Sequence, residues 1–327
     1  MNLSELKEKD KYVIVPANIC YAAVFPILSA GLKPLFCDVD SYSGNVTTET
    51  IDKVLRDDVV AAIIPHMYGN PVRDLIKIGD RLSQRNIILI EDCASLMTNI
   101  KIDYFPGTIG DYVIYSTGYS KTIDLGMGGL LFSKKHSLDS ICEHEKQLPL
   151  FKDYFEKETS LFSKIYRLFR NQRHESDLEK EFYKGLKDSF ERNFLYRIDD
   201  NTQAQVLNEI KKLDEVICVR HRQYNLYKSK LVSKYNLYEF EDNAVPWRFN
   251  FFIDEDRDGF IQYCLKNSLP VSDWYPCVTP IFGETDTFVN ALWHEKHIIN
   301  FPLMISEEEI DKICQILIEY KGDLEDE

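Results

Sequence analysis

The stretch that decides the fold is Tyr115–Gly129, YSTGYSKTIDLGMGG, read together with Ile88–Ala94 upstream, ILIEDCA. The upstream stretch is an apolar run that ends on an acid, Asp92. The downstream stretch leaves a second apolar run at Ser116 and enters a turn rich in Gly and Ser, which carries Lys121. In parallel sheets, ligands bind beyond the carboxyl ends of the strands. The two stretches therefore predict that Asp92, Ser116 and Lys121 converge at one edge of such a sheet.

Short apolar runs alternate with helix-like segments through the first part of the chain. Because these runs are nearly continuous in Val, Ile and Leu, they predict a mostly parallel sheet with helices on both faces. Segment 72–84 is typical of the covering helices, since its apolar residues recur with helical spacing. The predicted strands are 12–17, 33–38, 59–65, 87–91, 112–116 and 129–133.

The second part of the chain predicts a helical segment and then a smaller domain. Residues 134–196 are charged and interleaved with aromatics at helical spacing, which we interpret as helices that pack on a partner surface. The fold class is therefore α/β, with a large domain over residues 1–200 that includes a helical dimerisation segment. A smaller α+β C-terminal domain is expected over residues 201–327.

The smaller domain is predicted to mix helices with a strand. A pattern typical of a capping box, Ser306 followed by Glu309, marks the start of the last helix. The expected elements are one long amphipathic helix over 201–230, a strand over 247–253 and helices over 260–267 and 307–320.

Composition and charge exclude several classes of function. The formal net charge of −14 argues against nucleic acid or an anionic membrane surface as the main partner. We find no apolar run near the roughly 20 residues of a membrane span. The polar start of the chain lacks the apolar core of a signal peptide, so we expect a cytoplasmic protein.

The eight cysteines are scattered, mostly inside apolar segments. No two of them have Cys-x-x-Cys spacing, so the sequence predicts neither a metal site nor a disulfide framework. We interpret them as buried free thiols in a reducing compartment.

Lys121 and Asp92 are the residue types that pyridoxal phosphate (PLP) requires. The aldehyde of this cofactor needs a lysine amine to form a Schiff base, and its pyridine nitrogen needs a carboxylate that keeps it protonated as an electron sink. The pair, placed on strand ends, indicates PLP chemistry.

The chain resembles the DegT/DnrJ/EryC1/StrS sugar aminotransferases, which have the fold-type I PLP architecture. The resemblance runs from about Tyr12 to Tyr320 and depends on motifs that occur together and in order. These are VIVPANIC, LKPLFCDVD, AIIPHMYGNP, ILIEDCAS, GDYVIYSTGYSKTIDLGMGG, KKLDEVICVRHRQYNLY, WYP and INFPLMISEEEI. The resemblance implies amino transfer from glutamate to the keto group of a nucleotide-linked sugar, in a homodimer.

The resemblance also implies roles for individual residues that bind the cofactor. Lys121 matches the Schiff-base lysine and proton shuttle, and Asp92 matches the partner of the pyridine nitrogen. Ser116 matches a hydroxyl that binds the phosphate. Cys20 stands where many members place an aromatic over the cofactor ring, and Ser95 where a longer side chain reaches the ring oxygen.

Four further residues are candidates for contact with substrate. His66 and Tyr68 follow a strand end that the family uses near its site, and Trp274 and Tyr275 belong to the WYP motif. A purely structural histidine is an open alternative for His66, and an aromatic core is one for the WYP pair.

Two departures from the family bear on the phosphate end of the site. Members have a Ser-Gly-Thr loop before the segment that residues 1–10 match, and its helix N-terminus holds the phosphate. They also place an Asn where this chain has Leu195, which cannot donate a hydrogen bond; Asn193 or Arg197 could substitute.

These departures leave two alternatives to an active aminotransferase. One is a catalytically impaired homologue that serves as a dimerisation or regulatory partner, or one half of a split enzyme. The other is a PLP dehydratase on the same scaffold. The second is less favoured because the deoxysugar dehydratases of this group replace the lysine by histidine, and Lys121 is retained.

Overall fold

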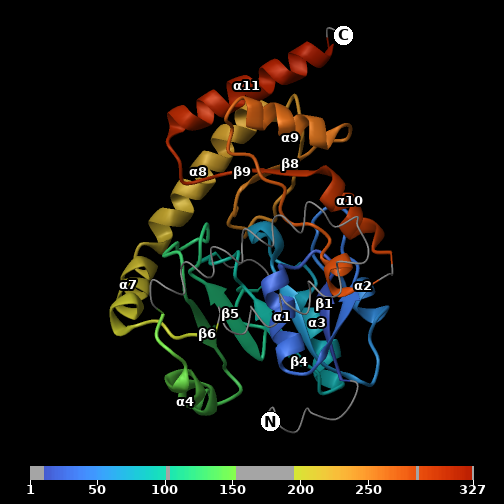
Figure 1. Cartoon of the computed structure of the whole chain (residues 1–327), viewed down its shortest axis with the longest axis vertical. Coiled ribbons are helices and arrows are strands. Elements are labelled where there is room, and N and C mark those ends of the chain that lie inside the picture. Colours follow the sequence, from blue (N-terminus) through green and yellow to red (C-terminus); the bar gives the residue numbers. More distant parts are fainter. Residues whose placement is uncertain (1–10, 101–103, 152–194, 285–286, 326–327) are drawn as a thin grey trace.

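A six-stranded sheet forms the base of the molecule in the computed structural model, which describes residues 11–100, 104–151, 195–284 and 287–325. Its strand order is β2-β1-β3-β4-β5-β6 (Figure 1). All pairs are parallel except β5 and β6. The predicted mostly parallel sheet is therefore confirmed. Its strands are β1 (Tyr12–Pro16), β2 (Lys33–Cys37), β3 (Val59–Pro65), β4 (Ile88–Asp92), β5 (Tyr112–Ser116) and β6 (Gly129–Phe132).

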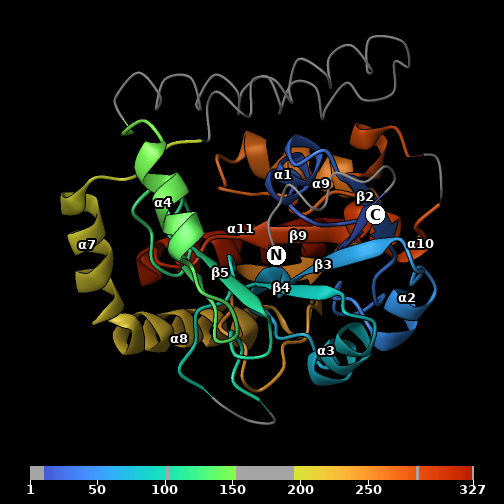
Figure 2. The same cartoon turned by 90° about the horizontal axis from the view of Figure 1, so that it is seen from below.

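Neighbouring residues of the central strands supply two separate cores. Val13 and Val15 of β1 pack in one hydrophobic cluster, whereas Ile14 between them packs in another. This alternation follows from the pleat of a strand, which points successive side chains to opposite faces. Helix α1 covers the first face and α2 and α3 the second, and Figure 2 shows α1 and α3 on opposite sides of β3 and β4. Their bounds are α1 (Tyr21–Ser29), α2 (Thr48–Asp52) and α3 (Leu75–Gln84).

A second, antiparallel sheet of three strands lies above the first (Figure 1). Its core is rich in aromatics; Tyr227 stacks on Phe249 with ring centroids 4.6 Å apart. The capping box of the last helix is confirmed, since the Ser306 N–H donates to Glu309 and the Glu309 N–H donates to Ser306. The elements here are α8 (Leu213–Leu231), β7 (Asn236–Leu237), β8 (Phe249–Phe252), α9 (Arg257–Lys266), β9 (Ile298–Phe301) and α11 (Glu307–Glu325).

The single long helix expected over 201–230 is wrong. The structure has two helices, α7 (Asp200–Ile210) and α8, which are separated at Lys211 and Lys212. Neither Gly nor Pro marks the break, so local propensity does not reveal it. Tertiary contacts set it instead: beyond the break, Ile217 is anchored in a small cluster with Leu96 and Val245.

The chain returns to the large sheet near its end. Val278 and Ala291 pack in the same core as α1. A boundary near residue 200 therefore remains our proposal, with this later segment added to the large unit. The connecting elements are η2 (Met67–Gly69), α4 (Asp139–Gln147), η3 (Thr279–Phe282) and α10 (Val289–His297). Of the helical segment predicted over 134–196, most lies outside the described residues, as do residues 1–10.

The cysteines agree only in part with the expectation from sequence. All eight cysteines are free, as expected, but Cys142 and Cys218 are exposed rather than buried, because they lie on outer faces of α4 and α8. Within the described ranges, no helix combines the length and the apolar content that a membrane crossing requires.

His294 on α10 is fully buried between the two sheets. Its ring stacks on Tyr68 and meets Phe252 edge-on, and both ring nitrogens lack a hydrogen-bond partner within the described part of the chain. Burial lowers the pKa of His294 to about 4, although the backbone of Ser41 and the carboxylate of Asp40 oppose that change.

We expect this histidine to make the fold sensitive to acid. Between its ordinary pKa of 6.5 and its folded pKa of about 4, the unfolded chain binds a proton that the folded chain does not. Stability is therefore full above pH 6.5 and falls as the pH drops toward 4, by about 3 kcal/mol from this group. Urea denaturation across this range should show that His294→Gln has a shallower pH dependence than the wild type. Parallel profiles for the two proteins would contradict this assignment.

Candidate active site

Three predicted site residues lie at the carboxyl edge of the large sheet. Asp92 is the last residue of β4 and Ser116 the last residue of β5, and these strands are neighbours. Cys20 directly precedes α1, in the connection that leaves β1. Because the strands are parallel, their ends meet at the same edge, as the sequence predicted.

Lys121 follows β5 in a turn that folds back on itself. The hydroxyl of Ser116 accepts the N–H of Gly118, and Asp124 accepts the N–H of Ser120. Ser120 has a left-handed backbone (φ 63°), as does Gly128 (φ 79°), where a Cβ would come within 3.1 Å of the Thr117 hydroxyl. The glycine and these local bonds fix the turn that presents Lys121.

The amine of Lys121 is held among polar and aromatic groups. Its Nζ donates to Oγ of Ser95 at 3.3 Å, and that Oγ lies 3.5 Å from the hydroxyl of Tyr275. The same Nζ lies 5.9 Å from the centre of the Trp247 ring. The structure thus brings Ser95 and Tyr275 to Lys121.

The charges of the site compensate one another. Burial alone would lower the pKa of Lys121, but Tyr275, Cys20 and Asp92 outweigh burial and raise it. Burial raises the pKa of Asp92, while the N–H of Ala94 and the charge of Lys121 oppose that change. Burial also raises the pKa of the Cys20 thiol. The shift of Lys121 favours its ammonium form, and the charges of Lys121 and Asp92 act on each other.

Of the WYP aromatics, Tyr275 is the one that contacts the lysine cluster. Tyr275 is 6% exposed and stacks on Trp247, with centroids 5.4 Å apart and planes 26° apart. Trp274 is half-buried, and its backbone N–H donates to the side chain of Asn300. Tyr275 therefore lies next to Lys121, and Trp274 lies one residue before it.

His66 and Tyr68 are buried, and both ring nitrogens of His66 are engaged within the protein. Nδ1 of His66 accepts the N–H of Val72, and Nε2 faces a carboxylate oxygen of Glu91 at 3.0 Å. Tyr68 is fully buried, and its hydroxyl accepts the N–H of Tyr275. The alternative left open for His66, a structural histidine, is favoured by this geometry.

The carboxylate of Glu91 holds the His66 ring and a nearby loop together. Its two oxygens accept the N–H groups of Gly107, Ile109 and Gly110 and face the His66 ring. Burial would raise its pKa, but these partners lower it. The nearby thiol of Cys93 completes a group of possible metal ligands. Since the carboxylate oxygens are already saturated by N–H donors, we interpret this group as a hydrogen-bond network that anchors the end of β4.

Three further residues that the sequence reasoning missed support the lysine turn. Arg220 is 4% exposed and donates to the carbonyl of Lys121 at 2.9 Å and to those of Pro246 and Trp247. Trp247 donates its indole N–H to the carbonyl of Ser120, and Arg248 donates to the Ser120 hydroxyl. A signal for Arg220 was present, because it falls in the helical stripe of buried residues Ile217, Tyr224, Tyr227 and Leu231.

The residues linked to the phosphate end are only partly described. Leu195 is 47% exposed, and Arg197 is half-buried, with an Nε that has no partner within the described ranges. Asn193 lies outside the described residues.

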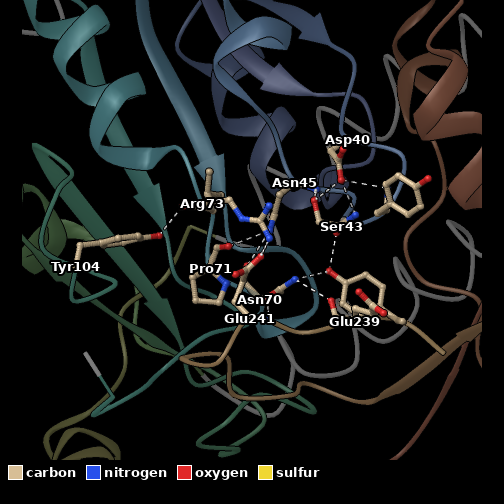
Figure 3. Close-up of polar contacts among 12 residues, drawn as sticks. Asp40, Ser43, Asn45, Asn70, Pro71, Arg73, Tyr104, Glu239 and Glu241 are labelled. Carbon is tan, nitrogen blue, oxygen red and sulfur yellow. Dashed lines mark hydrogen bonds and ion pairs between the residues drawn. The ribbon is translucent and has the colours of Figure 1, made fainter. Parts of the chain in front are cut away.

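A separate cavity of about 570 Å³ opens where the two units meet, and it shares no lining residue with the lysine cluster. Polar groups around this cavity form hydrogen bonds with one another (Figure 3). Asn70 is central: it donates to Tyr238 and accepts the N–H of Glu241, while Arg73 forms an ion pair with Glu241. We interpret this network as a connection between the large sheet and the smaller unit.

Fold and site together define a family. The chain belongs to the DegT/DnrJ/EryC1/StrS aminotransferase family, whose pattern matches residues 1–318.

Individual relatives share modest identity with the chain. GDP-perosamine synthase of Vibrio cholerae is 22% identical over 322 residues, which cover 94% of this chain and 79% of that protein. The protein of the same name from Escherichia coli O157:H7 is 31% identical over 141 residues, or 43% of this chain and 38% of its own length. A dTDP-4-dehydro-2,3,6-trideoxy-D-glucose 4-aminotransferase of Saccharopolyspora spinosa is 29% identical over 121 residues, or 37% of this chain and 31% of its length. The chain thus spans less than half of the last two proteins.

Solved structures share the fold. The aminotransferase TlmJ from Streptoalloteichus hindustanus superposes with a TM-score of 0.76 at 17% identity, covering 98% of this chain and 82% of that one. An E. coli GDP-4-keto-6-deoxy-D-mannose-3-dehydratase with bound hydrated PLP superposes with a TM-score of 0.69 at 18% identity, covering 95% and 81%.

Proposed function

We propose that this chain is a PLP-dependent aminotransferase that transfers the amino group of glutamate to a keto group of a nucleotide-linked sugar. Membership of the aminotransferase family supports the reaction class. The names of the relatives, which are enzymes of GDP- and dTDP-linked sugars, support the substrate class.

The observation that carries the proposal is that Lys121 and Asp92 lie near each other at one edge of the sheet. PLP requires an amine at its aldehyde and a carboxylate at its pyridine nitrogen. Both are present, and each lies close enough to alter the pKa of the other. Oδ1 of Asp92 accepts the N–H of Ala94, and within the described chain Oδ2 has no hydrogen-bond donor, so it could accept a ring N–H. The residues therefore fit the cofactor.

Each residue has a definable task in this reaction. When bound, PLP supplies an electrophilic aldehyde and an electron-withdrawing ring. Lys121 would bond to the aldehyde and later move a proton at Nζ. Ser95 accepts a hydrogen bond from that Nζ, with Tyr275 beyond it, so this pair orients the amine. Asp92 would hold the ring nitrogen, Ser116 would contact the phosphate, and Cys20 would pack on the ring.

We further propose that the protein works as a homodimer. Exposed apolar residues on and before α7 support this proposal, since Leu195 and Leu207 are 47% and 61% exposed. Such side chains are candidates for burial against a second copy.

A second candidate function is a catalytically impaired homologue, or one half of a split enzyme, that acts as a dimerisation or regulatory partner. Leu195 favours it, because leucine donates no hydrogen bond to a phosphate. Loss of phosphate donors, each worth roughly 1.5–3 kcal/mol, would weaken cofactor binding.

The amino-donor reaction separates the two candidates. The PLP-loaded chain should absorb at roughly 410–430 nm, a property of the cofactor bound to a lysine. An excess of L-glutamate should remove this band and release 2-oxoglutarate in amounts equal to the bound cofactor. If the chain binds PLP tightly and glutamate leaves the band unchanged, glutamate is not the donor. If the isolated chain binds no PLP, the impaired or split form is the better description.

A further inference from the structure

Arg248 lies just before β8 as a half-buried cation beside the lysine turn. Its guanidinium lies 4.7 Å from the centre of the Trp247 ring. Nη1 donates to the hydroxyl of Ser272 at 2.9 Å, and Nη2 donates to the hydroxyl of Ser120 at 3.1 Å. These contacts fix the plane of the guanidinium without neutralising its charge, because both acceptors are uncharged hydroxyls.

The charge of Arg248 has no carboxylate partner within the described part of the chain, and its buried Nε has no hydrogen-bond acceptor there. Arg257 is a useful contrast: its side chain is only 12% exposed, and it pairs with Asp273 at 3.0 Å. Buried charges are normally paired, since removing a charge from water is costly. A second cation, Arg220, is close enough to affect the site, because Arg248 helps to lower the pKa of Arg220. Within the described residues, Arg248 is therefore a cation that no carboxylate pairs with.

The position of Arg248 indicates which anion would pair with it. The indole of Trp247 lies within 6 Å of both the Lys121 amine and the Arg248 guanidinium. Ser120, which binds Arg248, is also the residue before Lys121. An amino donor must bring its nitrogen to the Lys121 end of the site, and its carboxylate is only two bonds from that nitrogen. A guanidinium fork matches a carboxylate in a bidentate geometry.

We propose that Arg248 forms a binding subsite for the carboxylate of the amino donor. This inference rests on the proposed function for the identity of the donor. It deepens that function by naming the group that recognises an amino acid. Ser120 and Ser272 act as positioning residues that hold the guanidinium in place, and the guanidinium packs over the ring of Trp247.

The test uses glutarate, a dicarboxylate without an amine, titrated by calorimetry into the full-length, PLP-free protein. Arg248→Met should weaken glutarate binding by roughly 10- to 100-fold, the loss expected for a charge-assisted pair. Arg248→Lys should recover only part of it, because an ammonium lacks the fork. Arg56→Met is the matched control, since Arg56 also lies over an aromatic ring, that of Tyr12, but is paired with Asp58; it should bind glutarate like the wild type.

Several outcomes would overturn the proposal. These are an unchanged glutarate affinity in Arg248→Met, an equal loss in Arg56→Met, or no glutarate binding by the wild type. A parallel titration with inorganic phosphate tests the other source of an anion: if Arg248→Met weakens phosphate binding and not glutarate binding, the subsite belongs to a phosphate group.

A separate measurement distinguishes failure of this proposal from failure of the proposed function. Arg248→Met should still give the PLP absorbance band, because Arg220 and Trp247 continue to hold the backbone of the lysine turn, while its KM for glutamate rises at least tenfold. A wild type that binds glutarate through Arg248 but gives no band would refute the PLP reaction and leave the carboxylate subsite in place.

Discussion

Lys121→Ala is expected to abolish the PLP absorbance band at roughly 410–430 nm and to reduce amino transfer by about 10²–10⁴-fold or more. The physical reason is that the amine serves twice, once as the group that bonds to the cofactor aldehyde and again as the base that moves the proton. Alanine keeps the turn, because its backbone can still accept the hydrogen bond that Arg220 donates to the carbonyl of residue 121. Absorbance titration with PLP measures the first effect, and 2-oxoglutarate release measures the second.

Lys135→Ala is the matched control for this variant. Lys135 follows β6 and pairs with Asp111 at 2.7 Å, and its side chain is 57% exposed. A surface pair of this kind contributes little, so the band and the activity should remain those of the wild type. A band that persists in Lys121→Ala would show that PLP bonds to another amine.

Arg220→Met is expected to lower the free energy of unfolding by about 3 kcal/mol. Arg220 is buried, and it donates to the carbonyls of Lys121, Pro246 and Trp247. Methionine has a similar length but no donor, so these three acceptors lose their partner. The gain from relieving a desolvated charge offsets part of the loss, since burial and Arg248 already lower the pKa of Arg220 to about 10. Urea denaturation measures the change.

The same substitution two residues further along α8 provides the control. Arg222 is 65% exposed and pairs with Glu307 at 3.1 Å. Arg222→Met should change stability by less than about 1 kcal/mol, as is usual for an exposed ion pair. An equal loss of unfolding free energy in the two variants would contradict the role of Arg220 as a support of the lysine turn. In Arg220→Met we also expect weaker PLP binding, because the carbonyl of Lys121 is no longer held.

Much of the large sheet could be predicted from local sequence. The continuous apolar runs of β1, β3 and β4 can be stable only when both faces are covered, and the structure covers them with helices. The division of 201–230 into two helices could not be predicted, because no residue at Lys211 or Lys212 signals a break. Tertiary contacts around Ile217 decide it.

The edge of the sheet that carries Asp92, Ser116 and Lys121 was predictable for a related reason, since parallel strands end side by side. The residues that support the turn around Lys121 could not be predicted. Arg220, Trp247 and Arg248 lie about one hundred positions or more from the lysine that they hold, and only the folded chain brings them there. For His66, the sequence suggested a role that the folded structure does not favour. Its place after a strand end suggests a substrate contact, but the buried carboxylate of Glu91 and the N–H of Val72 occupy its ring.

The central claim is that Lys121 is the residue to which PLP bonds. The most direct measurement is reduction of the PLP-incubated protein with borohydride, followed by proteolysis and mass mapping of the labelled lysine. We expect one phosphopyridoxyl group per chain, located on Lys121. A label distributed over exposed lysines such as Lys77 and Lys135, with Lys121 unmodified, would contradict it.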